Sequence, residues 1–570
     1  MWFLILCNLD NKTERVLGMA TTYDDTMFRE TFEHEFTWLN GFLRNARRFS
    51  NRSALIDPVC DKSWTYSELN KISNQFANAL YLDGIRKDDV IMGALINCPA
   101  FVFCYVGPRK IGAIFNPVNP SLSAAEMALL IDFNRPKVLI YSMNSAKMIT
   151  KALALSKYPP SRVILADNLK NIKIPEGHVS FEEYIENKSM LNPVMDFKPH
   201  IYDEVLRMCT SGTTALPKSV PINDINDVMT AHNVALVNKI DRTSVTLNLT
   251  PWFHRGGAHM GGICPTLYMG GTIVVMRNFS PLVTLKWVHK YGITHMTGAP
   301  ISFEMLTRVQ ELNNIDVSSL ECIVSMGAPL DQELCKRFMK YLCKNVMNGY
   351  GTTETLANCY LHQDALPQNA GSVGEACIDD DVRVIKVYPD HKGTPDEMVA
   401  NDGKTVGEVV IWAPSVSTYS YYNAPELEKE KYVDGWAYTG DLATWDENYY
   451  ITINSRKDDM IICSGENIYP TQIEEVIDSF DKVDDSMVTS ISDKVRGQEV
   501  VAYIKAKEPT LTEKEVAMFC RKSDKLSSFK CPRWYRIVND LPRTATGKKQ
   551  HHIMKKQAED DFKNGLLVRG

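Results

Sequence analysis

Several sequence features that mark common protein classes are missing from this chain. No apolar stretch is long enough to cross a bilayer. The closest candidate, residues 90–108, is interrupted by glycine, asparagine and proline, which predicts a buried strand followed by a buried helix instead. The 14 cysteines include no CxxC pair and no HExxH motif occurs, so neither a disulfide framework nor a zinc site is predicted. The motifs GxxxxGK[ST] and GxSxG are absent as well. A Walker-type NTPase and a hydrolase with a serine nucleophile elbow are therefore excluded.

The composition is that of an ordinary globular protein with a mild negative charge. Hydrophobic residues make up 44% of the 570 residues and charged residues 23%, and 63 basic against 69 acidic side chains give a net charge of −6. This balance argues against general nucleic-acid binding, which usually needs a basic domain. The length fits about four domain-sized units. Scattered free thiols in so large a chain indicate a reducing, cytoplasmic environment.

Short apolar runs alternate with helix-like stretches through most of the chain before residue 456. The strand-like runs cover residues 90–96, 136–142, 162–165, 271–276 and 321–325, and the helical patterns cover residues 124–133 and 282–291. Alternation of this kind predicts an α/β fold with largely parallel sheets. Residues 407–412 and 419–441 instead indicate antiparallel, barrel-like β structure within the same large body.

The composition changes near residue 456, where a small α+β unit is predicted to begin. Between Lys530 and Gly570 there are ten basic and four acidic residues, so this unit carries a local positive charge beside an acidic body. Two parts of opposite charge are suited to meet over an anionic ligand. The predicted organisation is an N-terminal extension (residues 1–28), a large domain (29–457) and a small C-terminal domain (458–570).

The strongest local signal is the segment Thr210-Ser211-Gly212-Thr213-Thr214-Ala215-Leu216-Pro217-Lys218, which follows a predicted strand at 205–209. Hydroxyl groups, closely approachable backbone N–H groups and a terminal lysine suit the oxygens of a polyphosphate. A polar surface turn explains the same composition, so the segment alone leaves both interpretations open.

Three further segments combine a turn with one charged residue. Glu354 ends the segment Asn348-Gly349-Tyr350-Gly351-Thr352-Thr353-Glu354 and is of the type that binds Mg²⁺, although a helix N-cap explains it equally. Asp441 follows the turn Tyr438-Thr439-Gly440 and can accept two ribose hydroxyls, or simply belong to the turn. Lys548 ends the segment 542–548, as a cation on a glycine-containing loop or as an exposed tail lysine.

The order and spacing of these segments resemble the superfamily of acyl-CoA synthetases, peptide-synthetase adenylation domains and firefly luciferase. The resemblance runs from about residue 30 to residue 557 and includes Ser325-Met326-Gly327-Ala328-Pro329, Ser455-Arg456-Lys457-Asp458-Asp459 and Gly465-Glu466-Asn467-Ile468-Tyr469-Pro470. It implies ATP-dependent activation of a carboxylate to an acyl-adenylate, usually followed by transfer to a thiol. ATP, Mg²⁺ and coenzyme A are the implied cofactors.

The resemblance also implies a role for each motif residue. The phosphates are assigned to Thr210, Ser211, Gly212, Thr213, Thr214 and Lys218, the adenine slot to Gly327, Ala328, Pro329, Asn348, Gly349 and Tyr350, the α-phosphate to Thr353, the metal to Glu354, and the ribose to Asp441 and Arg456. The catalytic roles fall to Lys548, Glu354 and Thr213. Asp458 is implied as the hinge of a rotating small domain, which brings in first Lys548 and then the Gly465 loop that lines the thiol tunnel.

The substrate is expected to be read by the segment 250–259, which leads into the acyl pocket in this superfamily. The segment holds Trp252, Phe253 and His254 and no acid, which disfavours an amino-acid substrate. With Met326, these residues predict a pocket for a medium-sized, cyclic or aromatic carboxylic acid. The predicted function is an AMP-forming acid–thiol ligase, an acyl-CoA synthetase whose reaction could also run in reverse. The alternative is an adenylating enzyme that passes the acyl group to a carrier-protein thiol.

Overall fold

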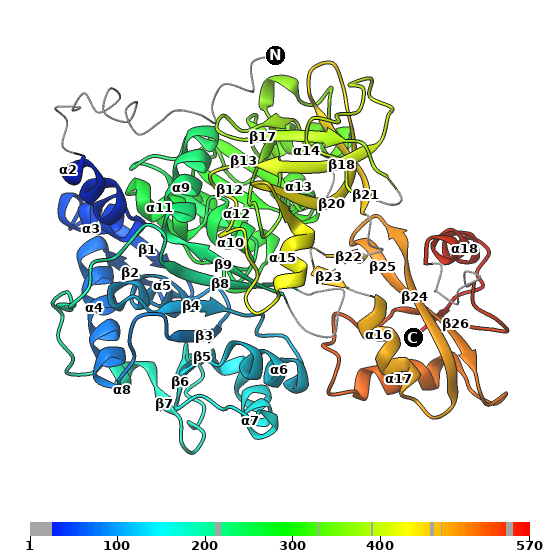
Figure 1. Cartoon of the computed structure of the whole chain (residues 1–570), viewed down its shortest axis with the longest axis horizontal. Coiled ribbons are helices and arrows are strands. Elements are labelled where there is room, and N and C mark those ends of the chain that lie inside the picture. Colours follow the sequence, from blue (N-terminus) through cyan, green and yellow to red (C-terminus); the bar gives the residue numbers. More distant parts are fainter. Residues whose placement is uncertain are drawn as a thin grey trace, which may run out of the picture.

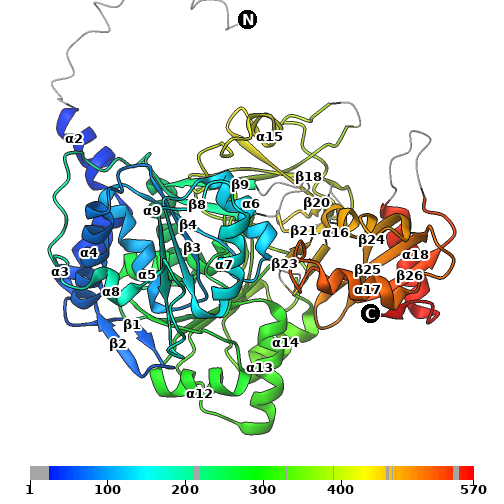
Figure 2. The same ribbon diagram turned by 90° about the horizontal axis from the view of Figure 1, so that it is seen from below.

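The computed structural model describes residues 25–210, 218–327, 330–388, 391–456, 461–464, 466–468, 470–542 and 551–570. It has a large body formed by three sheets and their helices, and a smaller domain beside it (Figures 1 and 2). In the described part of the chain, no helix combines the length and the apolar character needed to cross a membrane.

The first sheet of the large body is largely parallel, with strand order β7-β6-β5-β3-β4-β8-β9. Its strands are β3 (Val90–Ala94), β4 (Ile114–Pro117), β5 (Val138–Ser142), β6 (Arg162–Ala166), β7 (Val179–Ser180), β8 (Glu204–Thr210) and β9 (Lys218–Asn223). The segment 90–108 forms a buried strand, β3, followed by a buried helix, α5 (Pro99–Val106), which confirms the prediction for this segment. Every residue of β3 is buried because helices cover both faces of the sheet.

The second sheet has nine strands in the order β16-β15-β14-β13-β12-β10-β11-β1-β2 and is parallel at its centre. Its strands are β1 (Ser53–Asp57), β2 (Lys62–Thr65), β10 (Val245–Asn248), β11 (Thr272–Val274), β12 (His295–Gly298), β13 (Cys322–Met326), β14 (Val346–Tyr350), β15 (Cys359–Leu361) and β16 (Glu375–Ala376). The carboxyl ends of β13 and β14 lie side by side, because Met326 pairs with Gly349.

Helices of the large body cover and connect these two sheets. They are α2 (Thr26–Glu30), η1 (Thr31–Glu35), α3 (Trp38–Arg48), α4 (Tyr66–Leu82), α5 (Pro99–Val106), η2 (Pro108–Ile111), α6 (Ala124–Asn134), η3 (Met143–Ser145), α7 (Ala146–Leu155), α8 (Phe181–Ile185), α9 (Asp224–Asn238), α10 (Arg255–His259), α11 (Ile263–Met269), α12 (Pro281–Tyr291), α13 (Pro300–Asn313), α14 (Gln332–Tyr341) and η4 (Gln363–Ala365). Several helices begin with a side-chain cap. In α4 and α6, Thr65 with Glu68 and Ser123 with Glu126 form capping boxes.

The third sheet is antiparallel and pairs β17 (Asp381–Ile385), β18 (Gly407–Trp412), β19 (Tyr432–Val433), β20 (Trp436–Trp445) and β21 (Ile451–Arg456). The prediction of antiparallel structure is correct for 407–412 and for 432–441, where β19 and β20 pair, but wrong for Pro425–Lys431, which form helix α15. Its sequence, with proline first, acids in the first turn and lysines in the last, is a helix signature that the neighbouring tyrosines obscured.

A separate sheet forms the small domain, and its first strand begins at Ile461. It contains β22 (Ile461–Cys463), β23 (Glu466–Ile468), β24 (Val483–Asp493), β25 (Gly497–Ala506), β26 (Trp534–Val538) and β27 (Val568–Arg569), with helices α16 (Pro470–Asp478), α17 (Glu513–Lys522) and α18 (His551–Lys563). Strands β22 and β23 face the large body, whereas α18 lies on the far side (Figure 1). The predicted α/β fold with a small α+β C-terminal domain is confirmed.

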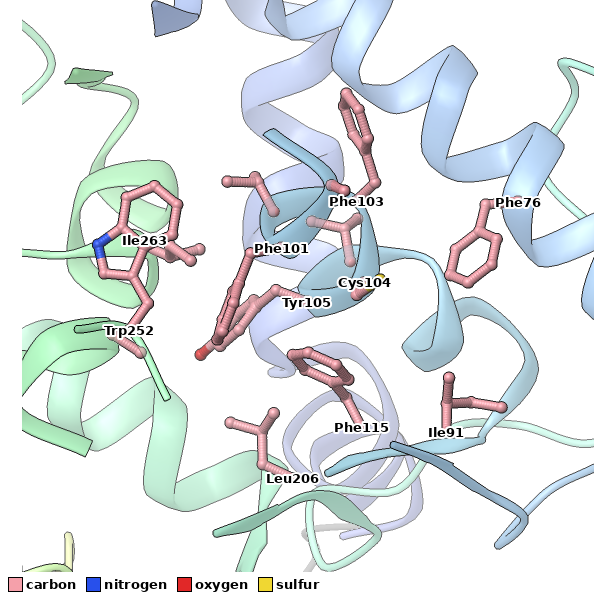
Figure 3. Close-up of a cluster of buried hydrophobic side chains, with 14 of the residues drawn as sticks. Phe76, Ile91, Phe101, Phe103, Cys104, Tyr105, Phe115, Leu206, Trp252 and Ile263 are labelled. Atoms are coloured by element: carbon pink, nitrogen blue, oxygen red, sulfur yellow. The ribbon is translucent and has the colours of Figure 1, made fainter. Parts of the chain in front are cut away.

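The largest hydrophobic core lies where the first two sheets meet. Aromatic side chains of α5, Phe101 and Tyr105, pack with Phe115 of β4 and Trp252 from the loop after β10 (Figure 3). The rings of Phe101 and Trp252 lie 5.7 Å apart in an edge-to-face arrangement. This core fixes the two sheets relative to each other, and so fixes the loops at their carboxyl ends.

Candidate active site

A cavity of about 280 Å³ lies at the carboxyl ends of β13 and β14, bounded by the third sheet and by the first strand of the small domain. Its lining includes the polar residues Lys218, Thr353 and Glu354. It also includes an apolar set, formed by Met260, Met326 and the small residues Ala299 and Ala357. A cavity lined by both kinds of residue suits a ligand that joins a charged group to an apolar one.

The polar wall depends on a tight turn after β14. At Gly351 a Cβ atom would lie 1.1 Å from the carbonyl oxygen of Leu356, so only glycine allows this approach of the two backbone segments. The turn leads to Thr353 and Glu354, both of which line the cavity. The carbonyl of Thr353 accepts a hydrogen bond of 2.7 Å from the guanidinium of buried Arg255, which fixes the turn from below.

Glu354 is oriented by a buried tyrosine. The hydroxyl of Tyr421 donates to Oε1 of Glu354 at 2.7 Å. Burial, together with the nearby Glu354 carboxylate, raises the pKa of Tyr421 well above its usual range, so the phenol stays a donor. A single carboxylate held this way is a hard oxygen ligand of the kind that Mg²⁺ uses beside water and phosphate oxygens. The chemistry of this donor therefore fits the implied metal.

Asp441, which was predicted to bind the ribose hydroxyls, lies on β20 directly after Gly440, a residue that lines the cavity. Its Oδ2 accepts a hydrogen bond of 2.6 Å from the hydroxyl of Tyr350, and its backbone N–H is held by Thr439. The pairing of β20 with β21 places Arg456 directly opposite Asp441. The structure thus brings together three of the residues assigned to the nucleoside from three segments of the sequence.

Besides Tyr350, two of the residues predicted for the adenine slot line the cavity and one does not. Gly327, at a positive φ of 81°, and Gly349 are part of its wall. Asn348 is buried behind the wall, where its side-chain amide donates to the carbonyl of Ser372. Ala328 and Pro329 lie outside the described residues.

The predicted phosphate loop joins the ends of an antiparallel pair. Thr210 ends β8, pairs with Lys218 at the start of β9, and Lys218 lines the cavity. Ser211, Gly212, Thr213 and Thr214 lie outside the described residues, as do Asp458, which was predicted as the hinge, Gly465 and Lys548.

The apolar set consists of ordinary core residues of several elements. The methyl group of Met326 lies against Gly256, where a Cβ would be only 2.3 Å away. The sulfur of Met260 accepts a hydrogen bond of 3.3 Å from the hydroxyl of buried Tyr360. No motif contains Met260, Ala299 or Tyr360, so sequence analysis missed them.

Of the four predicted acyl-pocket residues, His254 and Met326 line the cavity, whereas Trp252 and Phe253 do not. Trp252 is fully buried and packs on Phe101 in the main core (Figure 3). Phe253 belongs to the same core. Both point away because consecutive residues of this loop cannot all face one side, and the large rings fill the space between the sheets.

The small domain contributes to the site. Ile462 of β22 lines the cavity, and Glu466 of β23 lies 3.4 Å from Nε2 of His254. A second contact between the domains is the buried ion pair of Lys530 with Glu126. The side of the small domain that carries β22 and β23 therefore covers the cavity in this arrangement.

Beneath α10 lies a buried network of charged residues that the sequence did not indicate. Asp227 accepts hydrogen bonds from Arg109, Tyr105 and His259. His259 also bonds the carbonyl of Arg255 across the single turn of α10. The network holds the helix that carries Gly256 and leads to Met260, and it is distinct from the cavity. Because Arg109 and His259 already satisfy Asp227, we assign the network a structural role rather than a metal.

Comparison with known proteins places the chain in a family. The model of the AMP-binding enzyme family matches residues 42–422, and that of the AMP-binding enzyme C-terminal domain matches residues 472–548. The chain therefore belongs to the AMP-binding enzyme family.

Curated relatives cover nearly the whole chain. A long-chain-fatty-acid–CoA ligase, FadD13 of Mycobacterium tuberculosis, is 28% identical over 513 residues, which cover 88% of this chain and 95% of the relative. A 4-chlorobenzoate–CoA ligase of an Arthrobacter species is also 28% identical over 509 residues, covering 88% and 92%. The prediction of an AMP-forming acid–thiol ligase is confirmed at the level of enzyme class.

Solved structures agree on the fold. The amide bond synthetase McbA of Marinactinospora thermotolerans aligns with a TM-score of 0.80 at 21% identity, covering 92% of this chain and all of that one. The o-succinylbenzoate CoA synthetase MenE of Bacillus subtilis aligns with a TM-score of 0.76 at 23% identity, covering 91% and 98%. At this identity the likeness shows the adenylate-forming fold alone.

Proposed function

We propose that this enzyme forms acyl-CoA from ATP, coenzyme A and a medium-sized, cyclic or aromatic carboxylic acid, through an acyl-adenylate. The observation that carries the proposal is the cavity that Thr353 and Glu354 line together with Met260 and Met326. Such a cavity aligns the carboxylate of an apolar acid with the α-phosphate of a nucleotide. Positioning of this kind can contribute about 7–11 kcal/mol to catalysis.

The residues of the chain have separate tasks in the proposed reaction. Asp441, held by Tyr350, binds the ribose, and Thr353 binds the α-phosphate. Glu354, oriented by Tyr421, holds magnesium, which when bound neutralises charge on the phosphates. Lys548 neutralises the charge that develops as the carboxylate attacks and pyrophosphate leaves. No protein nucleophile is needed because the substrate carboxylate attacks.

The apolar set of the lining supports an acid with an apolar tail. The described part of the cavity wall offers methionine, alanine and leucine side chains, and the guanidinium of Arg255, which also lines the cavity, donates to two backbone carbonyls. A charged tail without a partner there would cost several kcal/mol. The volume of about 280 Å³ favours a compact tail over a long chain.

The second half of the reaction is assigned to the small domain. Asp458 is the proposed hinge, and the Gly465 loop, next to Glu466, is proposed to guide the thiol. The contact of Glu466 with His254 at the cavity supports a role for this side of the domain. A cytoplasmic location is also proposed, and the 13 unpaired cysteines of the described chain support a reducing environment.

The test is carboxylate-dependent exchange of ATP with pyrophosphate over a panel of short, medium, long, aromatic and cyclic acids, followed by addition of coenzyme A. We expect exchange with medium-sized or cyclic acids, then AMP and an acyl-CoA thioester. Exchange without a thioester would contradict the CoA ligase and favour transfer to a carrier-protein thiol. Exchange only with long-chain acids would contradict the compact substrate.

A further inference from the structure

A lysine that belongs to no recognised motif lines the cavity from the end of a helix, directly before a strand of the third sheet. Lys431 is the last residue of α15 and lines the cavity together with Lys218. Its side chain is only 18% exposed, and its Nζ lies 3.3 Å from the point that a Cβ would occupy at Gly440. The ammonium group therefore lies against the turn that precedes Asp441.

The neighbours of Lys431 place it between two proposed ligand sites. On one side, Gly440 is followed directly by Asp441, the proposed ribose acceptor. On the other side, the next residue, Tyr432, packs on Tyr421, with ring centres 5.6 Å apart, and Tyr421 donates to Glu354. In a nucleotide, the α-phosphate joins the ribose to the groups that bind the metal. A cation between Asp441 and Glu354 is therefore near the α-phosphate of a bound nucleotide.

In the described part of the chain, ion pairing does not account for this orientation. The acid that pairs with Lys431 is the adjacent Glu430, at 3.6 Å, and Glu430 is 61% exposed. Exposed pairs of this kind contribute little stability. The helix dipole favours a cation at the end of α15, but Lys429 satisfies the same preference while 73% of its side chain stays in solvent.

We propose that Lys431 is an additional nucleotide contact that binds the α-phosphate of ATP, of the acyl-adenylate and of AMP. The proposal rests on the proposed function. Because Lys431 lies on the large domain, its charge stays at the phosphate whatever the position of the small domain. It thus stabilises the adenylate during the thiol-transfer step, when the reaction must not lose its intermediate to solvent.

The experiment measures the binding of AMP and of adenosine by calorimetry to the wild-type enzyme and to Lys431→Met, Lys431→Arg and Lys429→Met. Loss of a charged hydrogen bond typically weakens binding about 10-fold to 100-fold. We expect Lys431→Met to weaken AMP binding by this factor and to leave adenosine binding unchanged. Lys431→Arg should restore most of the affinity, and Lys429→Met should behave as the wild type.

Two results would overturn the role of Lys431. One is wild-type AMP affinity in Lys431→Met, and the other is an equal loss for AMP and adenosine, which indicates general damage to the cavity. The proposed function is judged separately from the exchange assay on the wild type. If the wild type binds AMP but shows no acid-dependent exchange, the ligase function fails, whereas the comparison of AMP with adenosine still decides the role of Lys431. A wild type that binds neither ligand overturns both.

Discussion

Lys110 provides a quantitative test of the structure because its ammonium group is buried without a carboxylate. In the described part of the chain, its Nζ donates to Oδ1 of Asn70 at 2.8 Å and of Asn192 at 3.1 Å and forms no ion pair. Burial lowers the pKa of Lys110 from its usual value near 10.5 to about 7. The folded protein therefore releases this proton at a lower pH than the unfolded chain does.

The sign of the effect on stability follows from this difference. Between about pH 7 and pH 10 the unfolded chain binds one proton more than the folded protein, so stability rises with pH by up to about 1.4 kcal/mol per unit. Below pH 7 the folded protein must carry the buried charge, which costs it roughly 3–5 kcal/mol. Lys110→Met removes this dependence, although it also removes the hydrogen bonds to partly buried Asn70 and exposed Asn192.

The assay compares the free energy of unfolding of wild type and Lys110→Met from pH 6 to pH 9 in urea. We expect the wild type to gain roughly 2–3 kcal/mol relative to the variant over this range. Lys71→Met, at an exposed position of the same helix that carries Asn70, is the matched control and should show no such trend. A constant difference between wild type and Lys110→Met over the range would refute a neutral buried lysine.

Four further predictions concern the site. Tyr421→Phe should raise the magnesium concentration needed for half-maximal pyrophosphate exchange about 10-fold or more, because Glu354 loses the donor that orients it; an unchanged magnesium dependence would contradict this. Met260→Ala should raise kcat/KM for bulkier acids relative to smaller ones, measured over a homologous series; an unchanged ratio would place the acyl end elsewhere. Gly351→Ala should destabilise the protein by more than about 3 kcal/mol or abolish exchange, since its Cβ would overlap a backbone carbonyl, and a stable, active variant would disprove that geometry. Asp458→Pro should slow the coupled reaction more than exchange, as compared by thioester formation and exchange rates; equal losses would exclude a hinge.

Local signals explain which parts of the fold could be predicted from the sequence. The segment 90–108 changes from an apolar run to a helix at Pro99, and the structure has β3 and α5 there. The turn at Gly351 and the turn before Asp441 are likewise set by nearby residues. Each of these features depends on a few consecutive residues, so its pattern is complete within one short segment.

The apolar set of the cavity lining is different because its residues meet only after folding. Met260, Ala299, Met326 and Ala357 come from four separate segments, and each has the composition of ordinary core. By contrast, Trp252 looked like a pocket residue because it stands beside His254, yet it is fully buried in the main core. Periodicity and motif spacing cannot distinguish these cases, since the direction of a loop side chain depends on which sheet packs against it.

This division has a consequence for how the enzyme acquires its specificity. The proposed chemistry depends on turns at strand ends, where Gly351 allows close backbone approach and Gly440 adopts a positive φ of 76°, so few substitutions are tolerated. The acyl end consists of flexible methionines and small residues, which tolerate changes of volume at modest cost. Substitutions at Met260 or Met326 can therefore change the acid that is accepted without disturbing the nucleotide side. Substitution of Trp252, which lies between the sheets, should instead reduce stability and affect all acids alike.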